Sequence, residues 1–134
     1  LGDVYKRQNY EEAEVMDHFT ITGNTAQEAG SDNPITITAI DQNGDTATFY
    51  TGDHTLNFSG GNDSPNGAKA TIKDKNNTEQ YFGSDVTLTF TNGIATTNMK
   101  LVKAESAEID ATDGTYSTTG NTAGILMSPF LQLI

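Results

Sequence analysis

The stretch that decides the fold is VTLTFTNGIATTNMKLV, residues 86–102, in which two alternating runs flank an Asn-Gly pair. Leu88 and Phe90 alternate with threonines in the first run, and Ala95 and Met99 keep the same period in the second. Residues two apart lie on one face of a β-strand, so each run predicts a strand with one apolar and one polar face. Asn-Gly readily adopts the positive φ angles of a tight turn, so we expect the two strands to form a hairpin.

The same period of two recurs along the chain, and no window has the period of an α-helix. It predicts further strands over FTIT (19–22), PITITAID (34–41), TATFY (46–50), HTLNFS (54–59) and SAEIDAT (106–112). The long polar stretch 60–85 is interpreted as an insertion at a sheet edge, with one edge strand at 70–73. Seven or eight short strands separated by turn signals indicate an antiparallel β-sandwich. Its expected core consists of Phe19, Ile21, Ile35, Ile37, Phe49, Leu56, Phe58, Leu88, Phe90, Met99, Leu101 and Ile109.

Composition excludes several classes of partner. The chain has 134 residues, enough for one domain, and a formal net charge of −11. A protein this acidic has no basic face for the phosphates of nucleic acid, and anionic membrane surfaces are disfavoured for the same reason. Cysteine is absent, which removes disulfides and thiolate metal sites, and no apolar run is long enough to insert directly into a membrane.

Four segments resemble the bacterial immunoglobulin-like (Big-type) repeats of large secreted and surface proteins. They are Thr38–Asp45 (TAIDQNGD), Tyr50–Gly60 (YTGDHTLNFSG), Phe90–Thr96 (FTNGIAT) and Lys103–Gly114, which ends in ATDG. The resemblance implies an immunoglobulin-like sandwich that serves as a stalk, spacer or cell-adhesion module in a tandem repeat. It also implies an extracellular or cell-surface location, with neighbouring immunoglobulin-like domains, a surface receptor or a polysaccharide as partners. The family brings no catalytic residues.

The first eight residues, Leu1–Gln8, are expected to lie outside the domain. Their DVYKRQ matches a translated sequencing adapter, which predicts a non-native scar on a metagenomic fragment; the alternative is a basic tail. Residues 9–16 are then a linker and 17–128 the sandwich. Residues 129–134, ending in FLQLI, are a linker, the start of a following domain, or a frame-shifted end.

Five aspartates form a candidate calcium site. In an immunoglobulin-like sandwich, the start of the first strand and the turns after the second and sixth strands lie at one end. That end would gather Asp17, Asp41, Asp45, Asp110 and Asp113, whose carboxylates are the hard oxygen ligands that Ca²⁺ prefers. The alternative is that aspartate occupies these turns for local hydrogen bonding.

Enzymatic activity is not expected. The two histidines, His18 and His54, each follow an aspartate at the start of a predicted strand, where a polar residue is ordinary, and no G-x-S-x-G motif is present. The runner-up function is a carbohydrate-binding accessory module of a secreted enzyme. Such modules often present aromatic platforms, for which this tryptophan-free chain offers Tyr50, Tyr81 and Tyr116 as exposed candidates.

Overall fold

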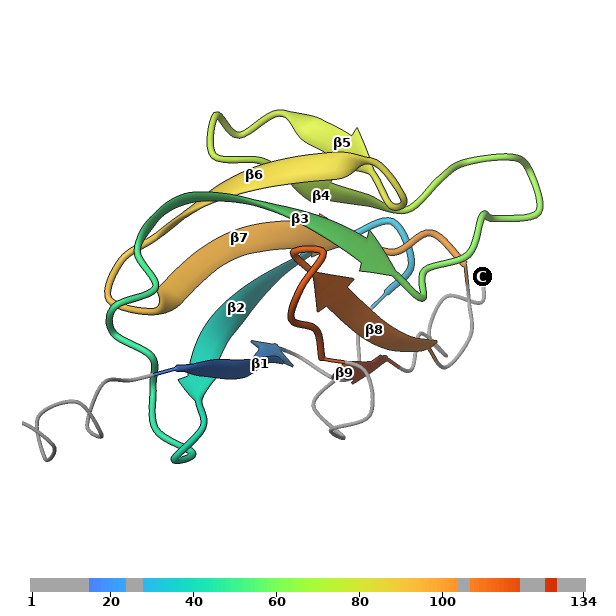
Figure 1. Cartoon of the computed structure of the whole chain (residues 1–134). Coiled ribbons are helices and arrows are strands. Elements are labelled where there is room, and N and C mark those ends of the chain that lie inside the picture. The colour runs from blue at the N-terminus through green and yellow to red at the C-terminus, as the bar shows by residue number, and fades with distance from the viewer. Residues whose placement is uncertain (1–14, 24–27, 104–106, 119–124, 128–134) are drawn as a thin grey trace, which may run out of the picture.

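The computed structural model describes residues 15–23, 28–103, 107–118 and 125–127, which form an all-β antiparallel sandwich (Figure 1). One sheet has the strand order β1-β2-β7-β4-β5 and the other β6-β3-β8-β9. The strands are β1 (Met16–Gly23), β2 (Asp32–Asp41), β3 (Gly52–Ser59), β4 (Thr71–Lys73), β5 (Glu79–Tyr81), β6 (Asp85–Phe90), β7 (Ile94–Lys100), β8 (Ala107–Thr112) and β9 (Ile125–Met127). The expected scar at Leu1–Gln8 and the C-terminal segment 129–134 lie outside the described residues.

The order of the strands is that of an immunoglobulin-like sandwich. Strands β1, β2, β7 and β4 occupy the positions of strands A, B, E and D, while β3, β8 and β9 occupy those of C, F and G. β6 extends the second sheet beyond β3, and β5 extends the first beyond β4. The described residues contain no helix, and therefore none that could cross a membrane.

Apolar side chains from both sheets meet in one core, as the alternation predicts. In β2, for example, Ile35, Ile37 and Ala39 are buried and the threonines between them are partly exposed. All the predicted core residues are buried except Phe49. Each fully buried Leu, Ile or Phe side chain stabilises the fold by about 1.5–3 kcal/mol, so this two-sided core is the main source of stability.

The predicted strand over 46–50 is wrong. Tyr50 N donates to Ala47 O at 2.9 Å, which closes a turn that carries the chain from β2 in one sheet to β3 in the other. The turn interrupts the alternation, so Phe49 faces solvent with 43% of its surface exposed. Tyr50, expected as an exposed platform, is buried instead with 8% exposed.

The predicted hairpin is correct in its turn and in its two strands but wrong in their pairing. Asn92 and Gly93 have φ angles of 50° and 86°, and Thr91 and Ile94 exchange backbone hydrogen bonds of 2.8 and 3.1 Å across them. Beyond this pair the strands part, because β6 belongs to one sheet and β7 to the other. Each strand has one apolar face, and the two faces cover the same core from opposite sides.

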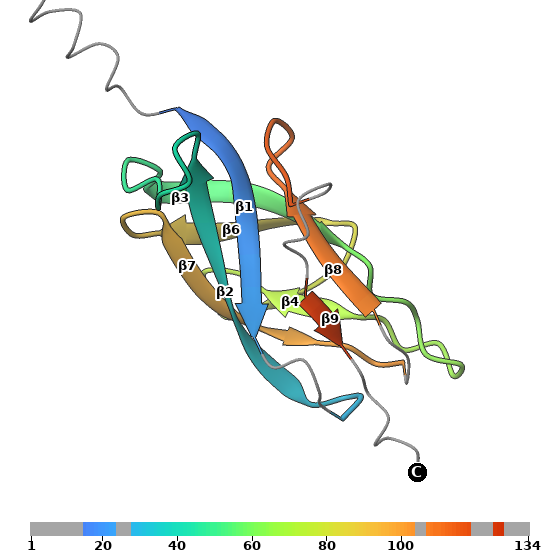
Figure 2. The same ribbon diagram turned by 90° about the horizontal axis from the view of Figure 1, so that it is seen from below.

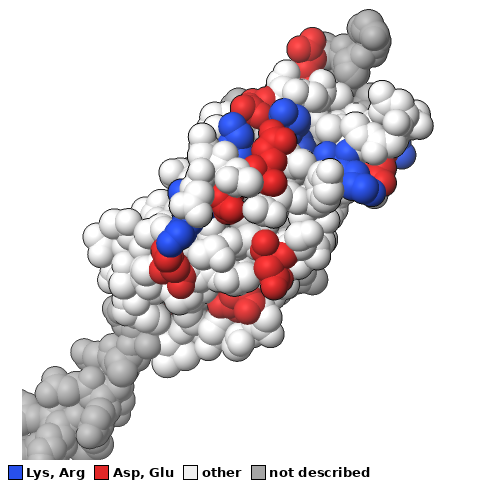
Figure 3. All heavy atoms as spheres, turned by 90° about the horizontal axis from the view of Figure 1, so that it is seen from above, with Lys and Arg blue, Asp and Glu red and all other residues white. Residues whose placement is uncertain are grey.

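The polar stretch 60–85 lies at a sheet edge, as expected, but it holds two strands. β4 pairs with β7 only through Thr71–Lys100 and Ile72–Met99, and β5 forms the outer edge. Lys100 Nζ lies 3.2 Å from a carboxylate oxygen of Glu79 in β5. Basic and acidic side chains lie together in this way on the face shown in Figure 3. Charged side chains on an outer strand discourage pairing with other chains.

The chain enters and leaves the sandwich at opposite ends. Met16, which begins β1, pairs with Asp41, which ends β2. The turns 41–45 and 91–94 and the turn after β8 lie at this end, which we call the β1 pole (Figure 2). β8 runs toward the β1 pole, and Met127, the last residue of β9, pairs with Ala107, the first of β8. The last described strand therefore ends at the far pole.

Candidate functional site

Four of the five aspartates of the predicted calcium site use their carboxylates in local contacts, and Asp45 contributes its backbone N–H to the turn. Asp41 is 2% exposed, and its Oδ1 accepts hydrogen bonds from Asn43 N at 2.9 Å and Asp45 N at 3.0 Å. Asp17 lies 2.7 Å from the ring of His18. Asp41 thus stabilises its own turn, and Asp17 pairs with its neighbour in sequence.

The carboxylates of Asp110 and Asp113 are also engaged. Asp110 accepts a hydrogen bond of 2.7 Å from the hydroxyl of Thr118, and Asp113 Oδ1 accepts from Thr115 N and Tyr116 N at 2.8 and 2.7 Å. Nowhere in residues 15–23, 28–103, 107–118 and 125–127 do three histidine, cysteine, aspartate or glutamate side chains lie close enough to hold a metal ion. The structure thus brings the turns to one pole without forming a metal-holding cluster among the described residues, and the carboxylates of Asp17, Asp41, Asp110 and Asp113 serve their local backbone or side chains.

Tyr50 is the centre of a buried aromatic cluster at the β1 pole. Its ring contacts Phe19 at 5.4 Å and Phe90 at 4.9 Å between centroids, and stacks on His54 at 3.9 Å. Its hydroxyl donates to Asp113 Oδ2 at 2.7 Å. The cluster joins both sheets and ties the turn before β3 to the turn after β8. Sequence reasoning missed it, because it placed Tyr50 on the surface and His54 at a strand edge without partners.

Burial and hydrogen bonding shift the pKa values of Tyr50 and Asp113 in opposite directions. Burial raises the pKa of the Tyr50 phenol well above its ordinary value, and the hydrogen bond to Asp113 raises it further. Burial also raises the pKa of the Asp113 carboxyl, but hydrogen bonds from Tyr116 N, the Tyr50 hydroxyl and Thr115 N outweigh it and hold that pKa below its usual range. Near neutral pH the pair is therefore a neutral phenol donating to a carboxylate.

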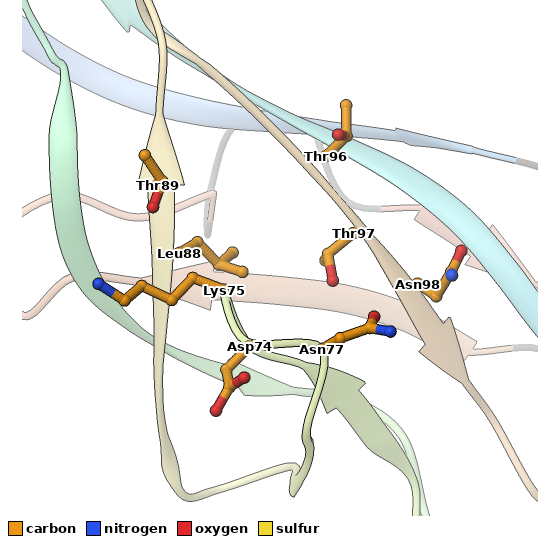
Figure 4. A pocket seen from close by; sticks show the side chains of 8 residues that line it. All are labelled: Asp74, Lys75, Asn77, Leu88, Thr89, Thr96, Thr97 and Asn98. Carbon is orange, nitrogen blue, oxygen red and sulfur yellow. The ribbon is translucent and has the colours of Figure 1, made fainter.

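A polar cleft opens where β6 and β7 part into different sheets (Figure 4). It has a volume of about 330 Å³. Its walls come from the β4–β5 turn (Asp74, Lys75 and Asn77), from β6 (Leu88 and Thr89) and from β7 (Thr96, Thr97 and Asn98). The turn is held over the cleft because Lys75 N donates to Thr87 O at 2.8 Å and the Thr97 hydroxyl donates to Lys73 O at 2.6 Å.

The charged groups at the cleft already have partners. Lys75 Nζ binds Asp53 Oδ2, and the Thr89 hydroxyl donates to Asp53 Oδ1 at 2.7 Å. The hydrogen bond from Lys75 and that from Thr89 lower the pKa of Asp53. Asp74 accepts from Thr78 N, Gln80 Nε2 and Asn76 N, and the pKa of its carboxyl is lowered, chiefly by the Thr78 hydrogen bond. Both carboxyls are therefore ionised at neutral pH.

The alternating patterns that predict the strands do not predict this cleft. The one available signal is the turn DKNN over 74–77, in which Asn77 adopts a φ of 66°. Asparagine tolerates this left-handed conformation better than most residues, and here it places an amide beside β7 (Figure 4). Asn98 belongs to a strand defined by a separate alternation, so only the fold brings the two amides to one cleft.

Comparison with known proteins assigns no family to the chain. No protein-family model matches it, and no curated protein matches its sequence. Among solved structures it is similar to a conjugative transposon lipoprotein from Bacteroides eggerthii DSM 20697, with 13% sequence identity and a TM-score of 0.44. The match covers 74% of this chain and 91% of that chain. A similarity of this size assigns neither family nor function.

Proposed function

We propose that the chain is a non-catalytic immunoglobulin-like module of a larger bacterial extracellular or cell-surface protein, acting as a stalk or spacer in a tandem array. The observation that carries the proposal is that β1 begins at one pole and β9 ends at the other (Figure 2). Domains joined in this way extend end to end rather than side by side. A ten-residue strand such as β2 spans about 33 Å, so each module would lengthen the array by roughly that distance or more.

The surface of the β1 pole supports contact with a preceding domain. Val15, Phe49 and Ile94 are large apolar residues with exposed side chains. Backbone hydrogen bonds from Gln42 N to Val15 O and from Gly93 N to Tyr50 O hold their segments at this pole. Apolar side chains at a domain end give a neighbour a surface to bury, while the net charge of −11 opposes lateral association. An adhesive role would use the sides of the sandwich, which such stacking leaves accessible.

The test is the shape of a protein in which two copies of the chain are joined in tandem. Small-angle X-ray scattering should give an elongated particle with a maximum dimension close to twice that of the single chain. Replacing Phe49 and Ile94 by serine should loosen the angle between the copies without lowering the melting temperature of the single chain. A folded-back particle of nearly spherical shape would contradict the spacer role.

The surrounding reading frame offers an independent test. Flanking copies of segments like TAIDQNGD and FTNG behind a secretion signal are expected from a tandem, secreted array. A single copy beside a glycosidase domain would instead favour the carbohydrate-binding accessory module.

A further inference from the structure

We propose that the cleft between β6 and β7 is a binding site for one neutral saccharide residue. This inference goes beyond the spacer role, since it concerns the side of the sandwich and not its poles. It rests on the side chains that line the cleft, on their hydrogen-bond partners, and on the sign of the charges around it.

Hydrogen-bonding groups on the cleft walls are available to a ligand. Among the described residues, the amides of Asn77 and Asn98 and the hydroxyl of Thr96 make no side-chain hydrogen bond, although all three line the cleft. Each can both donate and accept. The hydroxyls of a sugar also donate and accept, so they match these groups without requiring a charge on either partner.

The size of the cleft also fits a single sugar ring. Leu88 lines the cleft from β6 but is only 2% exposed, so the polar groups of the walls would hold the ring. The volume of about 330 Å³ lies at the lower end of the range for small-molecule sites. One residue of a glycan chain would fill the cleft, and its neighbours would extend into solvent along the sandwich edge.

Charge selects against ionic ligands. The one basic side chain at the cleft, Lys75, extends away from Asn77 and Asn98 toward Asp53, which binds its ammonium group (Figure 4). Asp74 uses both carboxylate oxygens in hydrogen bonds to its own turn and to Gln80. An acidic sugar would therefore meet a chain of net charge −11 without a free cation in the cleft.

The test is a titration of the ¹⁵N-labelled chain, followed by two-dimensional NMR. The probes are the methyl glycosides of glucose, galactose, mannose and N-acetylglucosamine, with glycerol and N-acetylneuraminic acid as comparisons. At least one neutral glycoside should give saturable shifts at residues 74–78, 87–89 and 96–98, with a dissociation constant in the millimolar range expected for so small a ligand. No saturable shift there with any neutral glycoside, equal shifts with glycerol, or tighter binding of the acidic sugar would overturn the proposal.

Two variants assign the binding to the cleft. Asn98→Ala removes one amide from β7, and Asn77→Gly removes the other while keeping the positive φ that the turn requires. Each should weaken binding at least about fivefold with little change in melting temperature. Thr20→Ala, on the outer surface of β1 and outside the cleft, is the matched control and should leave the affinity unchanged. Unchanged affinity in both folded asparagine variants would refute the assignment.

Discussion

Replacing Tyr50 by phenylalanine should measure how strongly the link between the two turns of the β1 pole stabilises the fold. The substitution keeps the ring that packs against Phe19 and Phe90, and it removes only the hydroxyl that donates to Asp113. No donor is left unpaired, because phenylalanine has none. The substitution therefore removes one interaction, the hydrogen bond from the Tyr50 hydroxyl to the charged Asp113 carboxylate.

The expected size of the effect follows from the surroundings of the acceptor. A hydrogen bond to a charged group contributes about 1.5–3 kcal/mol. Asp113 is only half-buried and keeps two backbone hydrogen bonds on Oδ1, so water can replace the hydroxyl at Oδ2. We expect the lower end, a loss of about 1.5–2 kcal/mol in unfolding free energy, or roughly 6–8 °C in melting temperature for a domain of this size.

Urea unfolding followed by circular dichroism gives the free energy, and calorimetry gives the melting temperature. Tyr81→Phe is the matched control, because Tyr81 is 56% exposed and lies outside the core. It should change the unfolding free energy by less than about 0.5 kcal/mol. A Tyr50→Phe loss as small as that of the control would refute the view that this hydrogen bond ties the two turns together.

Three further predictions follow from the same structure. The folded-state pKa of Asp113 lies below its unfolded value, so the stability that its ionised carboxyl contributes is complete above about pH 4 and is lost as pH falls through the folded pKa. In urea titrations, Asp113→Asn should therefore reduce the loss of unfolding free energy at acid pH. Gly60→Ala should lower the unfolding free energy far more than Gly44→Ala, because a Cβ at position 60 would lie 2.0 Å from Glu108 O. A Cβ at position 44 would meet no atom within 4 Å, so Gly44→Ala costs only the strain of a positive φ, about 1–2 kcal/mol. Calcium chloride should raise the melting temperature no more than sodium chloride of equal ionic strength, since the described residues contain no cluster that could hold a metal ion; a calcium-specific rise would contradict this.

The parts of the fold that could be predicted are those specified by local alternation. In β2, β6 and β7 the period of two fixes which face is buried, and a shift by one residue would expose the whole apolar set. The sequence TATFY over 46–50 has the same apparent period, yet its turn closes between Ala47 and Tyr50 without Gly, Pro or Asn inside it. No turn signal marks the reversal. For this reason Phe49, predicted to be buried, is exposed, and Tyr50, predicted to be exposed, is buried.

The Asn92-Gly93 turn shows a second limit of local reasoning. The dipeptide specifies the backbone angles of a tight turn, and those angles are present. An Asn-Gly turn is compatible with a hairpin within one sheet and with a connection between two sheets, because each connection joins two strands that have one apolar face. Which of the two forms depends on the pairing of β6 with β3 and of β7 with β2, residues distant in sequence. The separation that results is also what opens the polar cleft.

The candidate sites differ in a way that only the structure reveals, namely whether a polar group is already paired. Topology correctly placed the turns bearing Asp41 and Asp113 at one pole, but aspartate is frequent in turns because it accepts hydrogen bonds from the backbone around it. That local role uses the oxygens a calcium ion would need. Asn77 and Asn98 attract less notice in the sequence, yet their amides make no such bonds within the described residues. A ligand competes only for groups that folding has left available, so the cleft is the better candidate, although it contains fewer charged residues than the pole.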